Sequence, residues 1–216
     1  MLHIQSFNFN PLQENTYIVY NDQGDCVLID PGCYFENERK QLANFLQSKA
    51  LEPKILLNTH CHLDHVFGLN WVHENYGLPV HIHPLEDRVL EGSTISGVKW
   101  GLPFDPYQGT KVYLEEGQQL KIGDHIWDIF WIPGHSPGSI CFYDKAQGFL
   151  ISGDVLFKRS IGRTDLPGGN YESLIQGIHE KILTLPDEVI VYPGHGVPTT
   201  VGEERIHNRF LHSSRP

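Results

Sequence analysis

The 216-residue chain is poor in cysteine, in runs of basic residues and in long apolar segments, and each scarcity excludes a class of protein. Its four cysteines are scattered and form no CxxC pair. A chain of this length buries a sufficient core without disulfides, so we expect four reduced and mostly buried thiols. The formal net charge is -10 and no cluster of Lys and Arg is present. This argues against a nucleic-acid partner, because phosphate contacts need clustered cations.

The sequence also lacks membrane and secretion signals. No stretch approaches the ~18–20 consecutive apolar residues of a membrane span. Residues 1–8 contain neither the basic region nor the apolar region of a signal peptide. We therefore expect a cytoplasmic protein without a membrane partner.

Short apolar runs alternate with amphipathic segments along the chain, and this alternation predicts a layered α/β fold. Strands are predicted over 2–9, 16–20, 26–29, 54–58, 80–82, 119–122, 126–132, 140–143, 148–151 and 189–192. Helices are predicted over 36–50, 66–76 and 171–183, with Asn170 as the N-cap of the last. The segment 92–109 is rich in Gly and Pro and has no periodicity, so we expect a loop there.

A weak internal echo favours two halves with a sheet in each. Residues 18–30 and 141–154 both read as a strand, a polar turn, a buried strand and then an acidic residue. No linker of low-complexity composition divides the chain. We therefore expect a single domain over residues 1–216.

The densest chemical feature is the segment 59–65, with the sequence THCHLDH, in a predicted strand-to-helix loop. Imidazoles two residues apart, as in His60 and His62, point the same way in an extended segment. Asp64 and His65 follow the turn and can face an adjacent spot. This spacing suits two neighbouring metals, and imidazole with carboxylate is a typical ligand set for Zn, Fe or Mn.

Three further segments, 129–135, 149–154 and 189–195, each read as a buried strand, then Pro or Gly, then a candidate ligand. Together with the first segment they give seven candidate metal ligands at strand ends: His60, His62, Asp64, His65, His135, Asp154 and His195. These divide into two sets bridged by the carboxylate of Asp154: His60, His62 and His135 in one, and Asp64, His65 and His195 in the other. Two adjacent metals can share a hydroxide and polarise a carbonyl or phosphoryl oxygen, so the pattern indicates a hydrolytic site.

In content and order, these motifs resemble those of the metallo-β-lactamase fold hydrolases. The resemblance covers about residues 1–200 and includes the segments 59–65, 134–138, 152–154 and 193–195. It implies a four-layer αβ/βα sandwich with a dimetal site at one edge of the sheets. The aspartate at position 154 differs from the zinc β-lactamases, which carry a cysteine there.

Within that superfamily, the segments 152–157 and 161–165 are similar to glyoxalase II (hydroxyacylglutathione hydrolase), especially its short bacterial relatives. The similarity implies a thioesterase for S-lactoylglutathione-like substrates, in which a metal-bridging hydroxide attacks the thioester carbonyl. Asp64 and Asp154 are the expected catalytic residues, Asp64 by binding metal and orienting the hydroxide. The expected cofactors are two divalent ions per chain, zinc first, with iron or manganese as alternatives.

Few residues follow His195, so we expect the chain to lack the C-terminal helical region with which full-length glyoxalase II holds glutathione. The predicted substrate-binding residues are the basic ones after Asp154, namely Lys158, Arg159 and Arg163. The expected partner is a small-molecule thioester. The oligomeric state is not indicated by the sequence.

Two alternatives stay open. The segment 162–165 is also similar to the persulfide dioxygenases of the same fold, which use a single iron. A metal-binding protein without turnover is the third hypothesis. Metal analysis with an oxygen-uptake assay separates the first two, and a thioester hydrolysis assay separates the first from the third.

Overall fold

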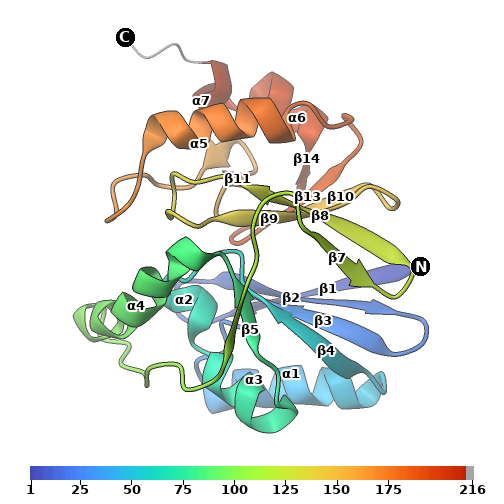
Figure 1. The fold of residues 1–216 in the computed structure, drawn as a ribbon, viewed down its shortest axis with the longest axis vertical. Helices are drawn as coiled ribbons and strands as arrows, with labels where there is room; N and C mark the ends of the chain where they lie inside the picture. Colours follow the sequence, from blue (N-terminus) through green and yellow to red (C-terminus); the bar gives the residue numbers. More distant parts are fainter. Residues whose placement is uncertain (213–216) are drawn as a thin grey trace. The chain divides into compact units, whose positions relative to one another are not determined.

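The computed structural model describes residues 1–212. The chain separates into two compact units, Met1–Leu114 and Glu115–Pro216, and within the described residues each unit contains one six-stranded sheet (Figure 1). No described helix has the length and apolar character needed to cross a membrane.

The sheet of the first unit combines an antiparallel meander with a parallel half. Its strands are β1 (Leu2–Phe9), β2 (Glu14–Asn21), β3 (Asp25–Ile29), β4 (Glu52–Leu57), β5 (Val80–Ile82) and β6 (Lys111–Tyr113), in that order across the sheet. The pairs β1–β2 and β2–β3 are antiparallel, whereas β3, β4, β5 and β6 pair in parallel. The carboxyl ends of β3, β4 and β5 therefore lie at the same edge of this sheet.

Apolar helix faces cover the first sheet. The helices are α1 (Glu36–Ser48), α2 (Leu63–Val66), α3 (Leu69–Tyr76), the 3₁₀ turn η1 (Pro84–Glu86) and α4 (Asp87–Lys99). Leu42 and Leu46 of α1 and Val72 of α3 share one buried cluster with strand residues such as Ile18 and Leu28. In Figure 1, α1 and α3 both lie along one face of the sheet. The single helix predicted over 66–76 is wrong in detail, because the chain forms two helices, α2 and α3.

The loop predicted over 92–109 is also wrong in its first part, because residues 92–99 belong to α4. The buried positions of this helix are Leu90, Ser93 and Gly97, which have helical spacing but little apolar content. Its exposed positions include Ile95 and Val98. Because α4 buries small residues such as Ser93 and Gly97 and exposes apolar ones, its sequence lacks the helical spacing of apolar residues from which a helix is predicted.

The sheet of the second unit is mostly antiparallel. Its strands are β7 (Gln119–Ile122), β8 (His125–Trp131), β9 (Ile140–Asp144), β10 (Phe149–Gly153), β13 (Ile190–Pro193) and β14 (Thr199–Thr200), in the order β14-β13-β10-β9-β8-β7. Strand β9 is antiparallel to both β8 and β10, and β13 is parallel to β10. Consequently β8, β10 and β13 run in the same direction and end at the same edge.

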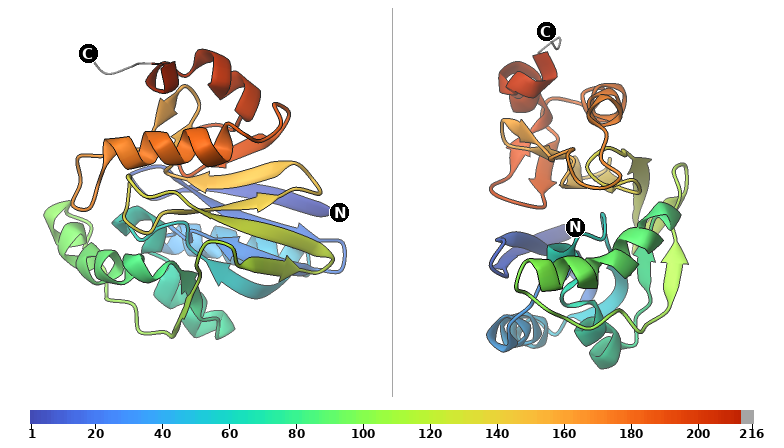
Figure 2. Two further views of the ribbon diagram at one scale, coloured as in Figure 1. Left: turned by 45° about the horizontal axis from the view of Figure 1, so that its top comes forward. Right: turned by 90° about the vertical axis from the view of Figure 1, so that its left-hand side faces the viewer.

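The part of the second unit that the structure describes also contains a small hairpin and three helices. They are β11 (Leu156–Phe157) with β12 (Ser160–Ile161), α5 (Tyr171–Gly177) continued by the π turn η2 (Ile178–Ile182), α6 (Val201–His207) and α7 (Arg209–His212). Leu174, Ile178 and Val201 pack in one buried cluster with Leu150 and Val191 of the sheet, and Figure 2 shows these helices beside it. The Asn170 N-cap is confirmed, because its side chain accepts a hydrogen bond from the amide of Ser173 at 2.9 Å.

The internal echo of the sequence is borne out as two hairpins. The first segment forms the antiparallel pair β2–β3 and the second forms the antiparallel pair β9–β10. The four cysteines are all free and buried, as expected.

Candidate metal centre

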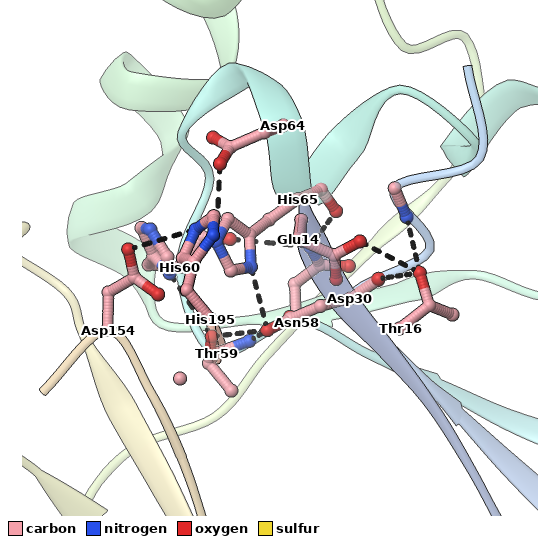
Figure 3. A network of polar contacts seen from close by, with 12 residues as sticks. Glu14, Thr16, Asp30, Asn58, Thr59, His60, Asp64, His65, Asp154 and His195 are labelled. Carbon is pink, nitrogen blue, oxygen red and sulfur yellow. Dashed lines mark hydrogen bonds and ion pairs between the residues drawn. The ribbon is translucent and has the colours of Figure 1, made fainter. Parts of the chain in front are cut away.

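In the first unit, the loop after β4 brings the predicted imidazoles together. His60 and His65 are fully buried, and their ring centroids lie 4.1 Å apart. The ring of His62 lies edge-on to that of His60 with a centroid separation of 4.7 Å. The Asp64 carboxylate is 3.8 Å from Nε2 of His65. Four of the seven predicted ligands therefore form one cluster within this unit, and Figure 3 labels His60, Asp64 and His65 among them.

Asp30, at the carboxyl end of β3, organises this cluster. Its Oδ1 accepts from the amide of Thr59 at 2.7 Å, and its Oδ2 accepts from the Thr59 hydroxyl at 2.6 Å and from Nδ1 of His65 at 3.0 Å (Figure 3). Because a carboxylate only accepts, Nδ1 of His65 carries the proton. The Thr59 hydroxyl donates its only hydrogen to Asp30, so at 3.1 Å its oxygen accepts from Nδ1 of His60. Both imidazoles consequently have a lone pair at Nε2, which is a form in which histidine ligates metals.

Asp30 is a positioning residue that the sequence analysis did not assign to the site. Its carboxylate, with His60 and His65, could hold a cation by proximity, since candidate ligand atoms of the three lie within 4.8 Å of one another. Both Asp30 oxygens are nevertheless engaged by Thr59 and by the Nδ1 side of His65. The signal available in the sequence was the acidic residue directly after a buried strand, the same pattern that marks Asp154.

Buried amides fix the backbone of the loop. Nδ2 of Asn58 donates to the carbonyls of His65 at 2.8 Å and His60 at 3.3 Å. Nδ2 of Asn10 donates to the carbonyl of Asp64 at 3.0 Å. These hydrogen bonds are buried, so water does not compete for them and the side chains stand on a rigid base.

Cys61 lies inside the same segment but is unsuited to ligation. Burial raises the pKa of its thiol well above the ordinary value, and the negative charge of Glu86 adds to this effect. Glu86 also accepts a hydrogen bond from the Cys61 amide at 2.7 Å. The Cys61 side chain also packs in the hydrophobic cluster of the first unit, so we assign the imidazoles and carboxylates of this loop as its donor set.

In the second unit, the other three predicted ligands follow the ends of β8, β10 and β13. Nε2 of His135 lies 3.4 Å from Oδ2 of Asp154, and Nε2 of His195 lies 3.5 Å from the same oxygen. The common strand direction explains why three positions so distant in sequence meet. One carboxylate facing two imidazoles is an arrangement that suits a bridging ligand.

The surroundings of His135 select the same tautomer for its ring. Nδ1 of His135 lies 2.9 Å from the carbonyl oxygen of Arg163, so this nitrogen carries the proton and Nε2 presents its lone pair toward Asp154. Two acceptors at such a distance repel each other unless a positive ion or a proton lies between them. The ring of Phe157 packs edge-on against His195 with a centroid separation of 6.1 Å. The predicted ligands of the two units are all imidazoles and carboxylates, which are donor types that divalent metals bind.

The three predicted substrate-binding residues have different environments. The guanidinium of Arg163 forms two hydrogen bonds to the carboxylate of Asp165, at 2.7 and 2.8 Å. Arg159 pairs with Glu203 at 2.8 Å. Lys158 lines an open cavity of about 530 Å³. Arg163 does not line this cavity.

Known proteins are similar to this chain in sequence and in fold. The profile of the Metallo-beta-lactamase superfamily matches residues 9–195. The "Probable metallo-hydrolase YqgX" of Bacillus subtilis is 39% identical, covering 93% of both chains. The "Hydroxyacylglutathione hydrolase GloC" of Haemophilus influenzae is 35% identical, covering 98% of this chain and 99% of its own.

Among solved structures, the protein TTHA1623 in a di-iron-bound form is 42% identical, with a TM-score of 0.86, covering 96% of this chain and all of the other. The predicted fold class is confirmed by this likeness. The chain belongs to the Metallo-beta-lactamase superfamily and has its mixed α/β fold, in which helices flank the sheets.

Proposed function

We propose that this protein is a two-metal thioesterase of the glyoxalase II type, acting on S-lactoylglutathione-like small molecules. The single observation that carries the proposal is the gathering of imidazoles and carboxylates at strand ends, with Nδ1 of His65 donating to Asp30 and Nδ1 of His135 to the carbonyl of Arg163. The similarity to GloC over nearly the whole chain supports the substrate class. The di-iron-bound relative supports two ions and admits iron beside zinc.

The proposed ligand assignment follows the sequence motifs. His60, His62 and His135 would hold one ion, Asp64, His65 and His195 would hold the other, and the carboxylate of Asp154 would contribute to both. Within the second unit, the short distances from Asp154 to both imidazoles support the bridging assignment.

Bound divalent ions supply the activation of water and the polarisation of the thioester carbonyl. The chain contributes the placement of the reacting groups. Asp64 orients the attacking water through its carboxylate, while the hydrogen bonds of Asp30 keep the imidazoles of His60 and His65 in position. The C–O bond forms and the C–S bond breaks, giving a carboxylic acid and a thiol. No strong general acid is required, because a thiolate leaves readily.

The test compares two activities of the metal-replete protein. We expect hydrolysis of S-lactoylglutathione that disappears on chelation and no oxygen consumption with glutathione persulfide. His135→Ala should abolish hydrolysis with an unchanged circular dichroism spectrum. Lys145→Ala, an exposed substitution in the turn after β9, should hydrolyse as the parent protein does. Persulfide-dependent oxygen uptake without thioester hydrolysis would show that the protein is a dioxygenase instead. If the protein showed neither activity, a metal-binding protein without turnover would remain.

A further inference from the structure

The second unit contains an open cavity of about 530 Å³ at the tip of the β11–β12 hairpin. Its lining comes from the hairpin and from the segment after β13: Phe157, Lys158, Arg159, His195, Gly196 and Val197. The volume suits a small molecule or part of one. Because His195 is a proposed metal ligand, a group bound in this cavity lies beside the reacting centre.

The turn that carries Lys158 is anchored by the C-terminal helices. The amide of Arg159 donates to Oε2 of Glu204 at 2.7 Å, and Glu204 is fully buried. Nδ2 of Asn208 donates both to Oε2 of Glu204 at 2.8 Å and to the carbonyl of Ser160 at 3.0 Å. Arg159 has a φ of +58°, which a residue with a Cβ keeps only when its surroundings hold it there. Lys158 therefore extends from a rigid base.

Charge pairing separates Lys158 from its two basic neighbours. Arg159 forms an ion pair with Glu203, and Arg163 forms one with Asp165. Among the described residues, the ammonium of Lys158 has no ion pair or hydrogen bond within the protein. The pKa of Glu203 is lowered first by its hydrogen bond from Arg159, and Lys158 contributes least among its causes. Lys158 is consequently the cation of the cavity that is available to a ligand.

We infer that Lys158 binds a carboxylate of the substrate and so selects anionic thioesters. This inference rests on the proposed function and names the substrate class more closely. An ammonium and a carboxylate form a charge-assisted hydrogen bond, one of the stronger polar contacts. The contact lies away from the bond that breaks, so it stabilises the bound substrate and the transition state equally. Its loss should raise KM and leave kcat unchanged.

Three thioesters distinguish where the carboxylate resides. S-Lactoylglutathione carries carboxylates on the thiol half, S-succinyl-N-acetylcysteamine carries one on the acyl half, and S-lactoyl-N-acetylcysteamine carries none. Lys158→Ala should raise KM about 10- to 100-fold for at least one of the two anionic substrates. KM for the uncharged substrate should not change. Lys158→Arg should restore most of the loss, and Lys145→Ala should match the parent protein throughout.

Equal effects of Lys158→Ala on all three substrates, or no effect on any, would overturn the inference. If the parent protein hydrolyses none of them, the proposed function fails, and calorimetry of ligand binding then tests Lys158 by itself. We would expect S-methylglutathione or succinate to bind the parent protein at least about 10-fold more tightly than Lys158→Ala. Binding that is the same in both proteins, or absent from the parent protein, would overturn the inference as well.

Discussion

Replacing Asp30 by Asn should weaken metal binding without removing any proposed ligand. Asp30 is almost fully buried and accepts three hydrogen bonds, two of which orient His65 and, through Thr59, His60. Asn has almost the same size but replaces one oxygen by an NH₂ group that cannot accept. The carbonyl oxygen of Asn can occupy the position that serves Thr59 Oγ1 and His65, so the amide of Thr59 then loses its acceptor.

The magnitude follows from these contacts. A lost hydrogen bond to a buried charged group costs ~1.5–3 kcal/mol, so the metal-free variant should lose about that much free energy of unfolding. Mutation of the partner that orients a ligating imidazole typically lowers metal affinity by about 10- to 100-fold, and the neutral amide of Asn is a weaker acceptor for Nδ1 of His65 than the carboxylate is. Urea denaturation of metal-free protein measures the first quantity. Competition with a chromophoric chelator measures the second.

Asp144→Asn is a matched control. Asp144 is fully buried, and its Oδ2 accepts from His125 at 2.6 Å and Trp127 at 3.0 Å, while its Oδ1 accepts from the amide of Gln147 at 2.9 Å. It ends β9, which runs opposite to β8 and β10, so it lies at the other edge of its sheet from the ligands of that unit. Both variants should lose stability, but only Asp30→Asn should lose metal affinity. Equal metal affinities in the two variants would refute the positioning role of Asp30.

Three further predictions follow from the site and its surroundings. Elemental analysis should show that Asp154→Ala loses metal from both proposed positions and that His195→Ala loses it from only one. Equally mild losses of metal in the two variants would contradict the bridging role of Asp154. No cysteine of the native protein should react rapidly with a thiolate-specific reagent at pH 8, because all four are buried and burial raises the pKa of Cys33 to about 12. A thiol that reacts rapidly before the protein unfolds would contradict this prediction. The hydrogen bond from Arg163 lowers the pKa of Asp165 from 3.8 to about 2, so any stability it adds is present above pH 3.8 and lost as the pH falls through about 2. In Arg163→Ala an NMR titration should move that pKa back up, and an unchanged value would disprove the pairing.

The sequence predicted most strands and the order of the ligands, because both depend on local patterns. A short apolar run followed by Gly or Pro and a polar residue is visible without the fold, as at His135, Asp154 and His195. The core strands were predicted within a few residues of their ends. The short strands β6, β11, β12 and β14 and the helices α6 and α7 contain too few residues for a period to show.

What the sequence did not reveal depends on contacts between distant residues. The role of Asp30 depends on the parallel pairing of β3 with β4, which brings it to Thr59 and His65. The difference between Lys158 and its arginine neighbours depends on which carboxylates lie nearby in space. The acidic residue directly after a buried strand marks Asp30 as a candidate, but which residues it contacts follows only from the fold, as does the pairing of the two arginines.

Elemental analysis of carefully metal-replete protein tests the central claim most directly. Seven ligands divided into two sets by a bridging Asp154 predict two divalent ions per chain. Two ions, both lost on chelation together with thioester hydrolysis, would agree with the account. One ion per chain, retained in His195→Ala, would contradict it and favour the mononuclear dioxygenase.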